Sequence, residues 1–244
     1  MRTYVVALSL AVVCSSPAAR AAETSGTSDS ARGGTTLSPL DVRIMSRVDY
    51  LAFHPDQQNR HLGVQALAAG RDEAARTYFQ RAARYADKLS QAALAELWWE
   101  GRGGPRDRAM GYIWMDLAAE RGTPHLLAKR EYYWAQLETA ERDRVQREGP
   151  AQFALYGDPA AKPRLEAGLR RGLAQTTGSR TGQAGTLEVC IDTDASGACL
   201  DWAQGHQYYA DRHWQPRAYW QAQDEALRMA GDVERRATPA STRP

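Results

Sequence analysis

The chain has 244 residues and contains seven Trp and eleven Tyr but only three Phe. Its formal net charge is +2, and two of its arginines, Arg2 and Arg20, lie in a leader that we expect to be removed. Without them the chain is neutral and has no general electrostatic attraction for nucleic acid or anionic lipid. We therefore expect no nucleic-acid function.

The first residues predict a secretory signal peptide. Arg2 precedes an apolar run over residues 4–13, small residues follow, and Ala19-Arg20-Ala21 offers an A-x-A cleavage site. The run is too short for a membrane-spanning helix of about 20 residues. We expect residues 1–21 to be cleaved and the protein to be periplasmic or secreted. In the alternative Cys14 carries a lipid, but the side chain before it, a valine, is bulkier than that processing normally accepts.

Residues 22–38 are rich in Ser, Thr and Gly with almost no apolar side chains, which predicts a disordered linker. The next segment, residues 39–53, predicts a lead-in helix, because Val42, Met45 and Val48 fall on one helical face. We expect this helix to cap a helical repeat domain over residues 39–174.

The most regular pattern lies in residues 91–122, where two helical segments flank the glycine-rich turn of residues 101–105. In the second segment apolar side chains recur every three or four residues around Trp114. The turn supplies residues that tolerate positive φ and then a proline, and the carboxylate of Asp107 can cap the second helix. The segment predicts a helical hairpin.

A second hairpin is predicted 36 residues upstream, where Tyr78 aligns with Trp114. Its helices are expected over residues 62–69 and from Asp72, and a third, degraded unit begins after Gly122. A hairpin that recurs with a period in the mid-thirties predicts an α-solenoid, because each unit buries its apolar face against its neighbours.

These units resemble the Sel1-like repeats, which are relatives of the tetratricopeptide repeat. The pattern of that family is filled by Ala93, Leu97, Trp98, Gly101, Gly103, Asp107, Trp114, Ala118, Ala119 and Gly122. Gly104 and Gly111 depart from the pattern, so we expect a looser contact between the two helices than in the family. The resemblance covers about residues 63–148. It implies an adaptor surface for proteins or peptides and no shared catalytic residues.

Adjacent aromatic residues cannot share one face of a helix, so one member of each such pair must point away from the repeat core. We predict Trp99, Tyr132, Tyr133 and Trp134 as a partner surface, because exposed Trp and Tyr bury a large area at low entropy cost. In the alternative, these side chains cover a neighbouring helix or the C-terminal segment.

After the repeats, helices are predicted over residues 138–146, 151–156 and 160–173, with a break at Gly149-Pro150 and a turn over residues 156–159. Residues 175–185 predict a Gly/Thr/Ser linker. A C-terminal module follows over residues 186–236, and residues 237–244 should be a disordered tail. Two β-like runs carry Cys190 and Cys199 on either side of a turn rich in Asp and Gly, which predicts a disulfide-linked β-hairpin in an oxidising compartment.

Motifs of common enzymes are missing from the sequence, including the G-x-S-x-G elbow, H-E-x-x-H and the phosphate-binding glycine loop. The turn from Asp192 to Gly197 matches the start of a calcium loop, but Ala203 stands where the bidentate Glu is needed. We expect no enzyme, no cofactor and no bound metal.

The sequence thus predicts a mainly α protein, a short α-solenoid of Sel1-like, TPR-like hairpins with a small C-terminal module that contains a disulfide-linked β-hairpin. The expected function is a non-enzymatic protein- or peptide-binding adaptor of the bacterial cell envelope. The alternative is an envelope carbohydrate or peptidoglycan binder, or a hydrolase, with its site among aromatic residues of the C-terminal module, namely Trp202, Tyr208, Tyr209, Trp214 and Trp220.

Overall fold

The computed structural model describes residues 37–175 and 187–237, with side chains as far as residue 231. The predicted signal peptide, residues 1–21, lies outside the described residues, and so do most of both predicted linkers and nearly all of the tail. None of the helices in the two described segments is both long and apolar enough to cross a membrane.

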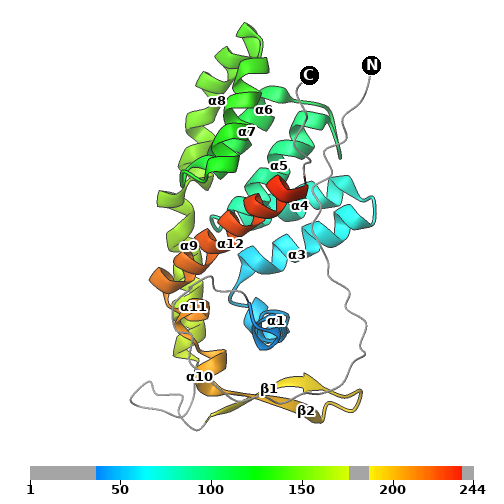
Figure 1. Ribbon diagram of the computed structural model, residues 1–244, viewed down its shortest axis with the longest axis vertical. Coiled ribbons are helices and arrows are strands. Elements are labelled where there is room, and N and C mark those ends of the chain that lie inside the picture. Colours follow the sequence, from blue (N-terminus) through cyan, green and yellow to red (C-terminus); the bar gives the residue numbers. More distant parts are fainter. Residues whose placement is uncertain (1–36, 176–186, 238–244) are drawn as a thin grey trace.

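The chain is mainly helical and carries one small antiparallel sheet of two strands (Figure 1). Its first half contains α1 (Pro39–Met45), α2 (Val48–Leu51), α3 (Pro55–Ala68), α4 (Asp72–Ala83), α5 (Lys88–Glu100), α6 (Arg108–Ala119) and α7 (Pro124–Gln136). Its second half contains α8 (Thr139–Tyr156), α9 (Asp158–Ala174), β1 (Glu188–Thr193), β2 (Cys199–Gln204), α10 (Gly205–Tyr208), α11 (Asp211–Trp214) and α12 (Pro216–Ala237).

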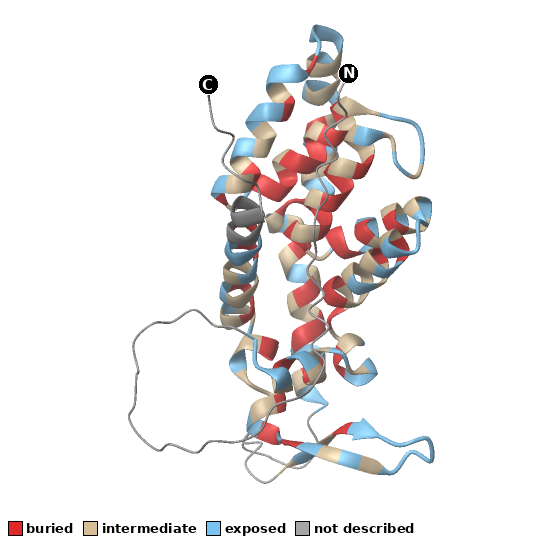
Figure 2. Cartoon of the chain, turned by 45° about the vertical axis from the view of Figure 1, so that its right-hand side comes forward, coloured by how far each residue is buried: buried red, intermediate tan, exposed pale blue. Residues whose placement is uncertain are grey.

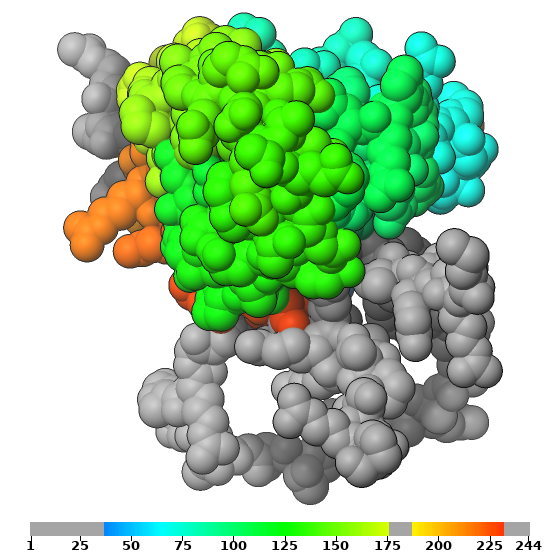
Figure 3. Space-filling model, turned by 90° about the horizontal axis from the view of Figure 1, so that it is seen from above, coloured from blue at the N-terminus to red at the C-terminus, as the bar shows by residue number. Residues whose placement is uncertain are grey.

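The two predicted hairpins are present as α3–α4 and α5–α6, and each pair packs together. Helix α6 begins as predicted, because the side chain of Asp107 accepts a hydrogen bond of 3.0 Å from the backbone N–H of Met110. Gly101 ends α5 in the left-handed region with a φ of 75°. Seen from above in Figure 3, α4, the α5–α6 hairpin and α7–α8 follow one another from one side to the other.

The prediction of a looser contact at Gly111 is wrong. A Cβ at Gly111 would lie 3.0 Å from the backbone nitrogen of Trp99, so this glycine lets α6 approach the backbone of α5 closely. At Gly103 a Cβ would lie 2.5 Å from the backbone of Asp72, at the start of α4. The turn of one hairpin therefore rests on the backbone of the other, which only glycine permits.

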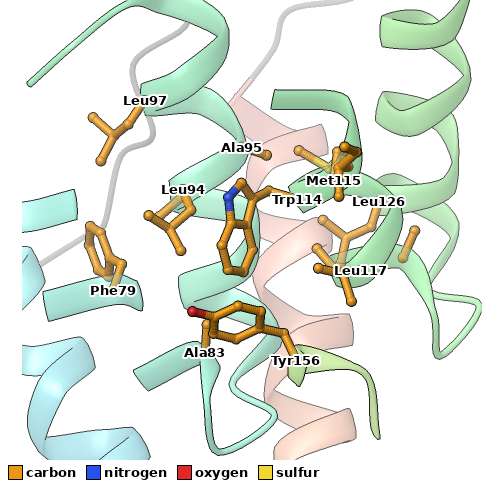
Figure 4. Close-up of a cluster of buried hydrophobic side chains, with 14 of the residues drawn as sticks. Phe79, Ala83, Leu94, Ala95, Leu97, Trp114, Met115, Leu117, Leu126 and Tyr156 are labelled. Atoms are coloured by element: carbon orange, nitrogen blue, oxygen red, sulfur yellow. The ribbon is translucent and has the colours of Figure 1, made fainter. Parts of the chain in front are cut away.

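The main core lies between α3 and α8 and is built from alanine, leucine and aromatic side chains. Trp114 is 2% exposed and meets the ring of Tyr156 at 4.7 Å between centroids. Figure 4 shows this ring among the labelled side chains Leu94, Leu117 and Tyr156, and Figure 2 shows the buried residues gathered on the inner faces of these helices.

Two boundaries differ from the predictions. Helix α3 begins at Pro55, seven residues before the predicted start, because proline at the first position of a helix loses no hydrogen bond. Helix α8 runs through Gly149 and Pro150, where we expected a break. Because Gly149 has no Cβ, part of the clash between a proline ring and the preceding residue is absent.

The lead-in segment is broken into α1 and α2, and only part of its predicted apolar face is buried, because Met45 packs against a core whereas Val42 and Val48 do not. Val42 and Val48 are 55% and 82% exposed, whereas Ile44 and Tyr50 are fully buried. These two side chains share a core with Ile191 of β1 and with residues of β2, α10 and α11, namely Ala203, Tyr208 and Trp214. Helices α1 and α2, near the start of the described chain, therefore pack against β1, β2, α10 and α11, near its end.

The disulfide-linked hairpin is present as predicted. Cys190 and Cys199 are bonded, with their Cα atoms 5.8 Å apart, and β1 pairs with β2 in antiparallel register. The C-terminal module ends in α12, which packs on the body of the molecule. Its Tyr219 and Trp220 share a core with Leu165 and Leu169 of α9.

Candidate docking surface

The four predicted surface aromatics lie at the C-terminal end of α5 and along α7, but only Tyr132 is largely exposed, at 61%. Tyr133 is 3% exposed and stacks on Trp99 with ring centroids 3.9 Å apart and planes within 10°. The prediction that Tyr133 lies on the partner surface is therefore wrong. The stacked pair forms a rigid base beside the exposed ring of Tyr132.

Trp134 lies apart from that base. Its ring meets Tyr112 at 5.0 Å, and the guanidinium of Arg142 covers it at 5.1 Å. Positions two residues apart on a helix point about 200° apart around its axis, so Tyr132 and Trp134 face different directions. The predicted set thus separates into an exposed ring, a stacked base and a covered indole.

Helical spacing shows which residues of α7 accompany Tyr132. His125, Lys129 and Tyr132 lie four and three residues apart, so they share one face of α7. The ammonium of Lys129 forms an ion pair with Glu96 of α5. The face with Tyr132 therefore borders α5, the helix that also supplies Trp99.

Arginine side chains surround this base. The guanidinium of Arg108 lies 4.8 Å from the ring of Trp99, and Nε of Arg106 donates a hydrogen bond of 2.8 Å to the carbonyl oxygen of Trp99. Positive charge at the last carbonyls of a helix offsets its dipole. Arg106 is exposed, and within residues 37–175 and 187–231 no carboxylate lies at ion-pair distance from it. The surface therefore offers aromatic area beside a positive charge.

Another group of polar residues was not predicted, and it is buried between the two ends of the chain. The carboxylate of Asp41 lies 3.1 Å from Nε2 of His213, and Nδ1 of the same ring lies 3.4 Å from the hydroxyl of Tyr50. An acid, an imidazole and a phenol in line can relay a proton. All three residues are at most 3% exposed, so a substrate has no direct access to them.

The buried group continues from Tyr50 toward α12. Gln57 donates to the hydroxyl of Tyr219 at 2.9 Å, and that hydroxyl donates to a carboxylate oxygen of Asp56. The other carboxylate oxygen of Asp56 is buried without a hydrogen-bond partner. We call Asp41, Tyr50, His54, Asp56, Gln57, His213 and Tyr219 the polar joint.

Burial and neighbouring charges shift the acidities in the polar joint. Burial raises the pKa of Asp56 to about 6, with Asp87 adding to the effect. Burial lowers the pKa of His54 to about 4, although two carbonyl acceptors favour its charged form. Burial also acts to raise the pKa of Asp41, but hydrogen bonds from Arg212 and Ser38 outweigh it and lower the pKa to about 2.

The spacing of the histidines in the sequence gives no sign of the polar joint. Asp41 and His213 are 172 residues apart, and no local pattern brings them together. The one available signal is the run of polar residues at the start of α3, residues 56–61. In the described segments no three His, Cys, Asp or Glu side chains form a group that could hold a metal.

Buried charges near Asp158, the first residue of α9, are also paired. Nζ of Lys88 lies 2.7 Å from a carboxylate oxygen of Glu120 and 3.0 Å from Asp158, and it donates to the carbonyl of Leu117 at 2.9 Å. Arg121 bonds Asp158 and the Asp224 carboxylate of α12. These partners satisfy the charges, and the cluster joins α5, α6, α9 and α12.

The aromatic residues proposed for a carbohydrate site are mostly part of the core. Tyr208, Trp214 and Trp220 are buried, at 3%, 1% and 9% exposure. Trp202 alone among the five is largely exposed, at 51%, and it points away from buried Ala203 because neighbouring side chains of a strand alternate. In the turn between the strands, Oδ1 of Asp194 accepts hydrogen bonds from Ser196 and Ala198, its own loop neighbours.

Comparisons of this chain with protein-family models, with curated proteins and with solved structures found no match.

Proposed function

We propose that this chain is a non-enzymatic adaptor of the bacterial cell envelope, a short α-solenoid of Sel1-like repeats that binds a protein or peptide beside α5 and α7. The observation that carries this proposal is Tyr132, which is 61% exposed and stands beside the stacked rings of Trp99 and Tyr133. A large ring on a rigid base buries area in a complex while little further side-chain motion is lost.

The charges near Tyr132 support a partner with a carboxylate close to an apolar side chain. Arg106 and Arg108 lie at the Trp99 end of the surface, and the exposed guanidinium of Arg106 bonds a backbone carbonyl and no carboxylate of the described residues. A carboxylate from a partner could form charge-assisted hydrogen bonds there.

Placement in the envelope is supported by the bonded pair Cys190 and Cys199, since such bonds persist in oxidising compartments. The signal peptide over residues 1–21 belongs to this proposal, and so does a periplasmic or secreted location. Measuring the intact mass of the exported protein tests both, because cleavage after Ala21 and a lipid on Cys14 give different masses.

The function is tested by purifying tagged chains from the envelope and identifying the proteins that come with them. We expect Tyr132→Ala to lose a protein partner that the unchanged chain retains, without a change in melting temperature. The matched control is Val48→Ala, since Val48 is also highly exposed, at 82%, and lies in α2. Equal recovery of every partner by both variants would remove the surface at Tyr132 from the proposal.

A carbohydrate or peptidoglycan binder with its site in the C-terminal module stays as the second candidate on one observation, the exposed ring of Trp202 on the outer face of the β-hairpin. Rings of this kind stack on sugars. Retention of the full chain on purified cell wall, abolished by Trp202→Ala and unaffected by Tyr132→Ala, would favour it.

A further inference from the structure

Helix α12 has two differently packed parts. In its first two turns Tyr219 and Trp220 are buried, and Tyr219 joins the polar joint. From residue 221 to residue 231, only Leu227 and Gly231 are buried, and Arg228, Met229 and Ala230 are exposed. In Figure 2 this part is mostly tan and pale blue. Between residues 221 and 231, α12 therefore buries few of its side chains completely.

Among the described residues, contacts from Asp224, Leu227 and Gly231 join this part of α12 to the body of the molecule. Asp224 accepts a hydrogen bond of 3.0 Å from Arg121, at the end of α6. Leu227, 2% exposed, enters the core that α5, α6 and α7 share, and Figure 4 shows α12 as a pale red ribbon beside that core. A Cβ at Gly231 would lie 2.1 Å from Nδ1 of His125, so the backbone of α12 lies directly on the side chain of this residue, in the N-terminal turn of α7.

The contact at His125 connects α12 to the proposed docking surface. His125 and Tyr132 are seven residues apart on α7, two helical turns, and share one face of that helix. Helix α12 covers the N-terminal end of this face and leaves Tyr132 exposed further along it. One surface is thus partly occupied and partly free.

We infer that the face of α7 and the α6–α7 turn is a docking site for an amphipathic helix, which α12 of the same chain occupies in the structure. The helix that fits carries an acid for Arg121, an aliphatic side chain three residues later and a glycine four residues after that, as Asp224, Leu227 and Gly231 do. This inference rests on the proposed function in one respect, because it gives the partner of that surface a chemical class.

Exchange of α12 for such a helix needs no rearrangement of the rest of the molecule. Arg121 keeps its bonds to Asp158 and to the carbonyl of Ala86 when Asp224 leaves. Tyr219 and Trp220 can stay buried, since Tyr219 bonds Gln57 of α3 and Trp220 bonds Glu166 of α9, with the guanidinium of Arg121 4.9 Å from the Trp220 ring. Because α12 is tethered, its high effective concentration disfavours a free competitor until its own contacts are weakened.

The test measures binding of a fluorescent peptide with the sequence of residues 216–237 to the full chain by anisotropy. In the chain with Leu227→Asp, a buried carboxylate should expel the second part of α12. We expect this chain to bind the peptide at least about tenfold tighter than the unchanged chain does, a difference of the size that one lost core side chain produces. The same peptide carrying Leu227→Asp itself should not bind.

A second variant guards against misfolding. Asp224→Arg places two cations together on the half-exposed side of α12 and leaves the core intact, so it should also raise peptide binding. A third variant closes the site, since Cys at both His125 and Gly231 would place their Cβ atoms within the ~4.5 Å that a disulfide spans. The oxidised chain should bind no peptide.

Peptide binding to the locked chain as strong as to the Leu227→Asp chain would overturn the inference, because the peptide would then bind elsewhere. Absence of binding to both Leu227→Asp and Asp224→Arg, each with native circular dichroism, would also overturn it. Either result leaves the proposed function standing if Tyr132→Ala still loses a partner. If the peptide binds as expected and Tyr132→Ala loses nothing, the proposed surface at Tyr132 fails and the helix site remains.

Discussion

Between α3 and α7, buried alanine and leucine side chains surround Trp114, and the helices that meet are neighbours in the sequence. Between α1–α3 and α11–α12, the buried contacts are hydrogen bonds among acids, histidines and tyrosines from opposite ends of the chain. The first region gains free energy from the burial of apolar area, which requires no particular pairing of atoms. The second gains specificity, because each of its polar groups is costly when left without its partner.

The largest expected effect is in the repeat core. Trp114→Ala removes the ring that packs on Tyr156, and we expect a loss of about 3–5 kcal/mol in the free energy of unfolding. Urea unfolding followed by tryptophan fluorescence and by circular dichroism measures it. A loss below about 1 kcal/mol would mean that the helices around Trp114 are not one packed core.

The polar joint should give the protein an unusual pH dependence. The folded pKa of Asp56, about 6, exceeds its ordinary 3.8, so stability rises as pH falls from 6 to 4, by about 3 kcal/mol. The folded pKa of His54, about 4, is below its ordinary 6.5, so protonation removes about 3 kcal/mol over nearly the same window. In the unchanged chain the two effects offset one another.

Asp56→Asn should separate these effects. Because the variant loses only the contribution of Asp56, its stability should fall between pH 6.5 and pH 4 by about 3 kcal/mol more than that of the unchanged chain. Unfolding in urea at both pH values checks this, and other carboxylates cancel in the comparison. Parallel pH profiles for the two chains would show that Asp56 is not buried with a raised pKa.

Removal of the disulfide tests whether the β-hairpin stabilises the core that it shares with α1 and α2. Replacing both Cys190 and Cys199 by Ser opens a loop of about ten residues, with an expected loss of about 2–3 kcal/mol. Since Ile191 shares a core with Ile44 and Tyr50, the loss should appear in the main unfolding transition. A change confined to the hairpin would separate it from that core.

The smallest expected effect belongs to a single oxygen atom. Tyr219→Phe removes the hydroxyl that donates to Asp56 and accepts from Gln57, and we expect a loss of about 1–3 kcal/mol. The matched control, Tyr132→Phe, removes an exposed hydroxyl and should change stability by less than about 0.5 kcal/mol. Equal effects at the two positions would contradict the difference between the regions.

The same comparison explains what could be predicted from the sequence. Hairpin residues such as Asp107 and Gly101 act within one or two helical turns, so their spacing predicts the cap and the turn. The disulfide followed from two cysteines around a short turn. The polar joint could not be predicted, since Asp41 and His213 are 172 residues apart in the sequence and only the tertiary fold brings them together. Among the site residues, adjacency in sequence could not show that Tyr133 would turn inward onto Trp99 while Tyr132 stays exposed.

Site-specific photo-crosslinking in intact cells tests the proposed docking surface most directly. A photoreactive phenylalanine replaces Tyr132 in one chain and Val48 in another, both exposed positions of the described chain. We predict that the chain labelled at 132 gives a discrete crosslinked protein band after export and that the chain labelled at 48 does not. The absence of any band at 132, or the same bands from both positions, would contradict a docking surface at α5 and α7.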